Sequence, residues 1–184
     1  MKRTSRIITP ALTALPLGLL IAATGCSTVS NSELARYQEA ERIGMARITT
    51  FDTLDFDVFS NQKWDRLHES HADDIVVTWP DGHETKGIEK HIEDLKALFV
   101  FAPDITIKVH PIRFGSGTWT TATGVMTGSF TQPMPTPDGK TIAPTGKRFA
   151  IGMATIGHWK SGKMDHEWLF WDNQDFMNQI GLGK

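Results

Sequence analysis

The sequence predicts an α+β fold, in which a strongly curved antiparallel sheet forms a cone around helices from the first half of the chain. Helical patterning, interrupted by one strand, extends to Pro103, and four long strands follow. The last strand, in residues 162–173, carries two tryptophans, a histidine and three acids within eight residues. Neither of its faces is wholly polar, so we interpret it as the strand that closes a pocket.

The first 25 residues are interpreted as an export signal rather than as part of the fold. A positively charged start precedes an apolar run, residues 7–23, that two prolines interrupt. Small residues then lead to Cys26, the only cysteine of the chain. This arrangement resembles the bacterial lipobox, although Ala23 stands where leucine is commoner. The resemblance implies a lipidated Cys26 and a protein anchored in the cell envelope, at the outer membrane or in the periplasm if the cell has two membranes. Ordinary cleavage that leaves a free thiol is the alternative.

Length and charge restrict the organisation and the partners of the chain. The 184 residues indicate one globular domain, which we place at residues 51–184, after a tether and N-terminal helix in residues 26–50. Removal of the three positive residues of the signal changes the formal net charge from −2 to −5. This acidic balance argues against a nucleic-acid partner. With one cysteine, no intrachain disulfide is possible.

Three helical regions are expected before the main strands. Ser32 is the expected cap of a helix that begins at Glu33 and continues to Phe59, either kinked or as two helices. Residues 63–71 form a short second helix, and residues 87–102 form an amphipathic third one. His68 and His71, three positions apart, would share a face of the second helix. A metal site needs a third ligand there, and we expect no metal.

Five segments have strand patterning, and they are separated by turns and one long loop. Residues 115–117 form a hairpin turn, and the proline-rich residues 131–146 form a loop of the kind that often serves as a lid. On the last strand, alternation places Met164, His166, Trp168 and Phe170 on one face, and Asp165, Glu167, Leu169 and Trp171 on the other. The expected strands are residues 73–80, 104–110, 119–130 and 149–159, and a last strand within residues 162–173.

Several motifs, in order, resemble the SnoaL-like polyketide cyclases of the nuclear transport factor two-like superfamily. The similarity covers about residues 51–182, and it implies the cone described above. Residues 124–128 and 144–147 are similar to segments of the ester cyclase branch, with Val125 where threonine is usual. The other matching motifs are Trp79-Pro80-Asp81-Gly82, Lys86-Gly87-Ile88-Glu89, Phe101-Ala102-Pro103-Asp104, Gly162-Lys163-Met164, Trp168, Trp171-Asp172 and Gln179-Ile180-Gly181.

The resemblance implies intramolecular aldol ring closure by a carboxylate base, without metal or cofactor. The position of the family's catalytic aspartate falls on Leu169, which cannot take a proton. Glu167 lies on the same strand face and is our preferred catalytic base, with a pKa raised by burial. Asp172 is the second candidate, and a cap of the final helix is its structural alternative. His166 faces the other side, where we expect a packed core or interface residue.

Four aromatic residues, Phe59, Trp79, Trp168 and Trp171, are the expected walls of a site for a small hydrophobic ligand. Three functions stay open at this point. The protein could be an enzyme of the cyclase or isomerase type acting on a small hydrophobic carbonyl compound. It could instead be a non-catalytic envelope protein that binds such a ligand. It could also serve assembly, with the outer face of the sheet forming a dimer. A homodimer is expected.

Overall fold

The computed structural model describes residues 29–183, so the predicted signal and Cys26 lie outside the described residues. The elements are α1 (Asn31–Thr53), the π-helix η1 (Leu54–Phe59), the 3-10 helix η2 (Trp64–Glu69), β1 (His71–Thr78), β2 (Glu84–Lys86), α2 (Ile88–Phe101), β3 (Thr106–Ile107), β4 (Arg113–Ser116), β5 (Trp119–Ser129), β6 (Met134–Pro135), β7 (Thr141–Ile142), β8 (Arg148–Lys160), β9 (Lys163–Trp171) and α3 (Asn173–Gln179).

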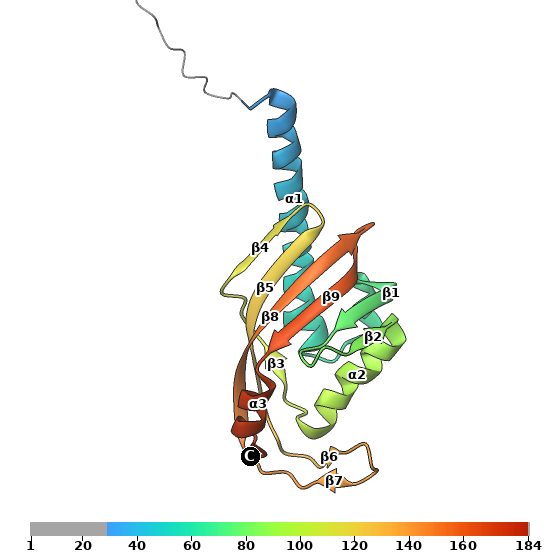
Figure 1. The fold of residues 1–184 in the computed structure, drawn as a ribbon, viewed down its shortest axis with the longest axis vertical. Coiled ribbons are helices and arrows are strands. Elements are labelled where there is room, and N and C mark those ends of the chain that lie inside the picture. Colours follow the sequence, from blue (N-terminus) through green and yellow to red (C-terminus); the bar gives the residue numbers. More distant parts are fainter. Residues whose placement is uncertain (1–28, 184) are drawn as a thin grey trace, which may run out of the picture.

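Helix α1 begins earlier than the sequence suggested. Ser30, and not Ser32, is its N-cap, because the Ser30 hydroxyl accepts from the backbone N–H of Glu33 while the Glu33 carboxylate accepts from the backbone N–H of Ser30. The N-terminal half of the helix extends beyond the sheet (Figure 1). Its C-terminal half continues directly into η1, so the boundary that we placed between residues 50 and 51 falls inside α1.

The main sheet has the strand order β2-β1-β9-β8-β5-β3, with β4 paired to β5. The pair β1–β9 is parallel, and the other pairs are antiparallel. The sheet curves around η1 and α2, which confirms the predicted α+β cone (Figure 1). Residues 104–110, expected to form a strand, contribute only the two residues of β3. Residues 131–146 contain the small hairpin β6–β7 at one end of the molecule.

A β-bulge in β9 corrects the predicted face of Met164. His158 pairs with His166, but Trp159 pairs with Met164, so one residue of β9 is skipped between them. The extra residue reverses the alternation. Met164 is therefore fully buried, and its sulfur lies against Gly157, the residue that pairs with Glu167. Beyond the bulge, Glu167, Leu169 and Trp171 keep the shared face that was expected.

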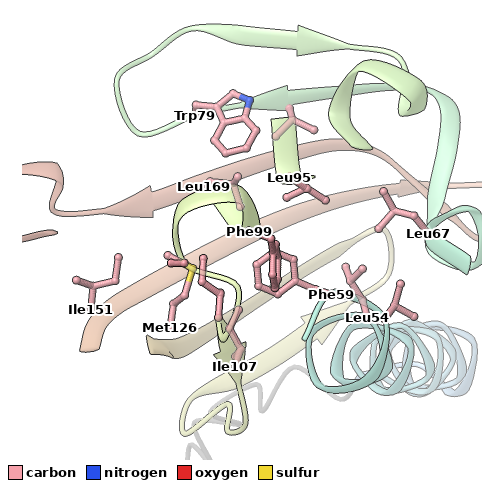
Figure 2. Packing of buried hydrophobic residues seen from close by; sticks show 14 of the residues in the cluster. Leu54, Phe59, Leu67, Trp79, Leu95, Phe99, Ile107, Met126, Ile151 and Leu169 are labelled. Carbon is pink, nitrogen blue, oxygen red and sulfur yellow. The ribbon is translucent and has the colours of Figure 1, made fainter. Parts of the chain in front are cut away.

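The hydrophobic core fills the concave side of the sheet. Side chains from η1, η2, α2 and the inner strands meet there (Figure 2). Phe59 and Phe99 contact edge to face, with ring centroids 5.2 Å apart. Within residues 29–183, no helix is long and apolar enough to cross a membrane.

Candidate active site

A cavity of about 50 Å³ lies inside the cone, beneath β9 and β8. Its walls are mostly apolar, and half-buried Leu98, Met153 and Trp171 stand at its outer part. A water molecule needs about 10–15 Å³ of such space, so the cavity holds a few waters in this conformation. Its polar lining residues are Asp55, His71, His91, Thr155 and Glu167.

The structure brings most of the predicted site residues together. Glu167, Phe59, Trp79 and Trp171 all line the cavity, and so does Leu169, the residue on which the sequence resemblance places the family's catalytic aspartate. Trp79 is fixed by a 2.9 Å hydrogen bond from its indole Nε1 to Thr85 Oγ1. The expected cavity behind the last strand is therefore present.

Two predicted site residues lie elsewhere. Trp168 is on the outer face of β9. Its ring stacks on that of His166, with ring centroids 3.7 Å apart, and on that of Trp119, with ring centroids 5.8 Å apart. This follows from strand alternation, which sends Glu167 and Trp168 to opposite faces. The carboxylate of Asp172 accepts hydrogen bonds from the backbone N–H groups of Gln174 and Asp175, so it caps α3. Neither residue lines the cavity, which corrects their placement in the pocket.

His166 also faces outward, as strand alternation predicted. Its Nε2 lies 3.1 Å from Thr78 Oγ1 of the neighbouring strand β1. Partial burial lowers the pKa of His166. Among residues 131–146, the proposed lid, none lines the cavity.

Glu167 is buried, and two imidazoles face it. Its Oε2 lies 3.6 Å from Nε2 of His71, the first residue of β1, and 3.7 Å from Nε2 of His91 on α2. Burial raises the pKa of the Glu167 carboxyl, but the facing His71 and His91 lower it by more, so the net direction is downward. The expectation of a raised pKa is therefore wrong, because it counted burial and omitted the imidazoles. Burial also lowers the pKa of His91 to about 4, which keeps that ring neutral near pH 7.

Asp55 is a second buried carboxylate in the cavity wall, and it belongs to a separate hydrogen-bonded chain. His110 contacts Asp55 Oδ2 through Nε2 at 2.8 Å and Asp52 Oδ1 through Nδ1 at 2.8 Å. Asp52 also pairs with half-exposed Arg113 near the surface. The chain of polar groups thus extends from the cavity toward solvent. Asp55 lies in η1, and π-helical turns occur often at functional sites.

The pKa values of Asp55 and His110 both shift upward. Burial raises the pKa of Asp55, and the hydrogen bond from His110 offsets only part of that effect. Burial lowers the pKa of His110, but the hydrogen bonds to Asp55 and Asp52 raise it by more. The cavity therefore contains one carboxylate with a lowered pKa, Glu167, and one with a raised pKa, Asp55.

Sequence reasoning missed Asp55, His91 and His110, and it placed His71 on a helix beside His68. Two of them had a usable signal, because Asp55 falls on the apolar stripe of its helix and His91 falls among the apolar positions of α2. A titratable residue on a buried helical stripe indicates a polar group inside the core. A helix was expected at His71, but the structure shows a strand there. His71 begins β1 and is buried, whereas His68 is exposed.

Comparisons with known proteins agree with this architecture. The family model described as SnoaL-like polyketide cyclase matches residues 52–180. The chain belongs to the SnoaL-like polyketide cyclase family. The comparison with curated protein sequences gives no match.

Solved structures of similar proteins support the same fold for this SnoaL-like chain. A putative SnoaL-like polyketide cyclase from Jannaschia sp. CCS1 is 19% identical, with a TM-score of 0.66 over 77% of this chain and 96% of that one. IdmH, a putative polyketide cyclase from Streptomyces antibioticus, is 20% identical, with a TM-score of 0.62 over 73% and 98%. A protein from Catenulispora acidiphila with a ketosteroid isomerase-like fold is 14% identical, with a TM-score of 0.57 over 74% and 92%.

Proposed function

We propose that this SnoaL-like protein catalyses proton transfer, of the cyclase or isomerase type, on a small hydrophobic carbonyl compound. One observation carries the proposal: two buried carboxyl groups, those of Glu167 and Asp55, line the same apolar cavity, and imidazole rings face each of them. Carboxylates whose pKa values are moved in opposite directions are suited to act as base and acid in one reaction.

In this mechanism Glu167 is the base. It removes a proton from the carbon next to the carbonyl, while Asp55 in its protonated form donates to the carbonyl oxygen, which gives an enol. Where the enol is conjugated with a second double bond, protonated Glu167 returns the proton to the far carbon and Asp55 takes its own proton back from the enol oxygen, which gives an isomer. In ring closure the enol carbon attacks a second carbonyl group, Asp55 takes back the enol proton, and protonated Glu167 protonates the new alkoxide. The apolar walls exclude water, which strengthens the interactions of both carboxyl groups with the reacting atoms.

The size of the cavity restricts the substrate. Pockets for drug-sized ligands measure about 300–1,000 Å³, far more than the cavity in this conformation. A compact substrate therefore fits the proposal better than a long polyketide chain. Larger molecules would require Leu98, Met153 and Trp171 to move outward.

Carbon–hydrogen exchange tests the proposal before the substrate is known. The full-length chain is incubated in D₂O with a panel of small cyclic and open-chain ketones, and deuterium uptake next to the carbonyl is followed by NMR. Accelerated uptake on at least one compound is expected. Uptake at the background rate across the panel, in a protein that binds some of these compounds, would favour the alternative function.

The alternative is a non-catalytic envelope protein that binds a small hydrophobic ligand. Leu169 favours it, because the family's catalytic carboxylate is replaced there by an apolar side chain that adds to the cavity wall. Mass spectrometry of small molecules that co-purify with the native protein would identify such a ligand.

We also propose the location and the assembly of the protein. The lipobox-like sequence before Cys26 supports a lipid anchor in the cell envelope, with the folded domain following α1. A homodimer is supported by the outer face of the sheet, where Phe114, Trp119, Ile156 and Phe170 are exposed large apolar residues. A second copy of the chain would cover this face.

A further inference from the structure

The spacing around Glu167 differs from that of the other carboxylate–imidazole pairs. His110 lies 2.8 Å from each of its two carboxylates, and His158 lies 2.6 Å from Asp165. These are hydrogen-bond distances. Oε2 of Glu167, in contrast, is 3.6 Å and 3.7 Å from the two imidazole nitrogens that face it. The three side chains point toward one another, but their nitrogen–oxygen distances are longer than those of a hydrogen bond.

The surroundings of His71 orient its free nitrogen toward Glu167. Its Nδ1 lies 2.9 Å from Ser70 Oγ, and the Ser70 hydroxyl donates to the carbonyl oxygen of Leu67 at 3.2 Å. With the hydroxyl proton used in this way, Nδ1–H of His71 donates to Ser70, and Nε2 points toward Oε2 of Glu167. Nε2 is fully buried and has no hydrogen-bond partner. A buried imidazole nitrogen that faces a carboxylate oxygen without a hydrogen bond is unfavourable unless a cation, either a proton on the ring or a metal ion, lies between them.

We propose that His71, His91 and Glu167 form a site for a divalent transition-metal ion such as Zn²⁺. The ligand atoms of the three residues lie within 4.8 Å of one another, and all three residues are buried. Two histidines and one glutamate are a known ligand set for catalytic zinc, which leaves one position open for water or substrate. Here that position would face the cavity. Ser70 serves as the outer partner that fixes the His71 ring, as is usual for metal-bound histidines.

This site goes beyond the proposed function and does not rest on it. A metal ion would polarise the carbonyl oxygen of a bound substrate as a Lewis acid. Glu167 would then be a ligand rather than a base, and Asp55 would remain as the proton-exchanging group of the cavity. Metal binding and base catalysis by Glu167 therefore exclude each other in one molecule.

The experiment measures metal binding directly, with Zn²⁺ alone as the probe. The full-length chain is purified in detergent, dialysed against a chelator and titrated with Zn²⁺ by calorimetry, and bound metal is counted by elemental analysis. One ion per chain is expected, with a rise in the thermal unfolding midpoint. Ser70→Ala should weaken binding by roughly 10- to 100-fold, and Glu167→Gln, which keeps the size of the side chain, by more.

His68→Ala is the matched control, because His68 is exposed three positions before His71. It should bind as the wild type does. Lack of saturable binding to the wild type would overturn the proposal, and so would unchanged binding in a Glu167→Gln variant with a native circular dichroism spectrum. The metal-free protein is also tested for carbon–hydrogen exchange. Exchange without metal would support the proposed function, whatever the result of the titration.

Discussion

Glu167 and Leu169 enter the same cavity from alternate positions of β9. The position that the sequence resemblance equates with the family's acid is thus an apolar side chain, and a carboxylate stands two residues earlier on the same strand face. A shift of two residues along a strand preserves the face and moves the group by about 7 Å. The polar centre of this protein is consequently at Glu167, whose carboxylate faces His71 of β1 and His91 of α2.

Glu167→Gln is expected to reduce deuterium uptake roughly 10²- to 10⁴-fold, the usual contribution of a general base. The protein should stay folded, because glutamine keeps the shape and the hydrogen-bonding capacity of the side chain. NMR in D₂O measures the rate, and circular dichroism checks the fold. Asp165→Asn is the matched control, since Asp165 lies on the same strand outside the cavity and should exchange at the wild-type rate. Equal rates in wild type and Glu167→Gln would remove Glu167 from the mechanism.

His110 should remain protonated on both ring nitrogens above pH 6.5, because the Asp52 carboxylate and a carboxyl oxygen of Asp55 accept from its two N–H groups. The pKa of His110 is higher in the folded state than in the unfolded state, where it is about 6.5. Protonated His110 therefore contributes its full stabilisation below about pH 6.5, and this contribution is lost as the pH rises through the pKa of the folded state. Asp52→Asn removes one partner and should lower the pKa of His110. NMR titration of the imidazole nitrogens measures it, and an unchanged pKa in the variant would contradict the prediction.

Gly44→Ala should destabilise the junction between α1 and the sheet. A Cβ at Gly44 would come within 2.3 Å of the Gly115 carbonyl oxygen, a backbone atom that cannot move aside cheaply. The cost of such overpacking is about 1–3 kcal/mol in the free energy of unfolding. Urea denaturation measures it. Gly152→Ala, where a Cβ meets nothing within 4 Å, should leave stability nearly unchanged.

Phe170→Glu should shift the proposed homodimer toward monomer, because it places a charge on the apolar outer face of the sheet. Phe170 is 49% exposed in the single chain. Size-exclusion chromatography with light scattering reports the mass. Leu34→Glu, a comparable change on the exposed part of α1, should leave the mass as in the wild type. A wild-type protein that is monomeric at all concentrations tested would show that the outer face has another role.

Cys26→Ser should release the protein from the membrane fraction of the native cell. Without the thiol there is no atom to which acyl chains can be attached, and each buried CH₂ of such a chain contributes about 0.8 kcal/mol to membrane binding. Fractionation followed by immunoblotting measures the distribution. A variant that stays with the membrane as firmly as the wild type would contradict the lipid anchor.

Much of the fold could be predicted from periodicity. The apolar spacing of residues 88–99 and the alternation of residues 119–129 and 149–159 are strong local signals, and α2, β5 and β8 follow them. The bulge in β9 could not be predicted, because it depends on pairing with β8 and not on local pattern. That is why Met164 was placed on the wrong face.

The site was predicted only in part. Glu167 was identified because it shares a strand face with Leu169, on which the resemblance places the family's catalytic aspartate. Its partners His71 and His91 come from β1 and α2, and only the parallel pairing of β1 with β9 and the packing of α2 bring them together. Contacts between residues so distant in the sequence leave no local trace.

The length of α1 determines how far the folded domain would lie from a membrane to which the chain is anchored. From Asn31 to Gly44, where the helix meets the hairpin of β4 and β5, a rise of about 1.5 Å per residue gives a stalk of about 20 Å. On a chain fastened at Cys26, this stalk would hold the folded domain clear of the lipid headgroups. Molecules would then arrive from the surrounding aqueous layer rather than by lateral diffusion within the bilayer.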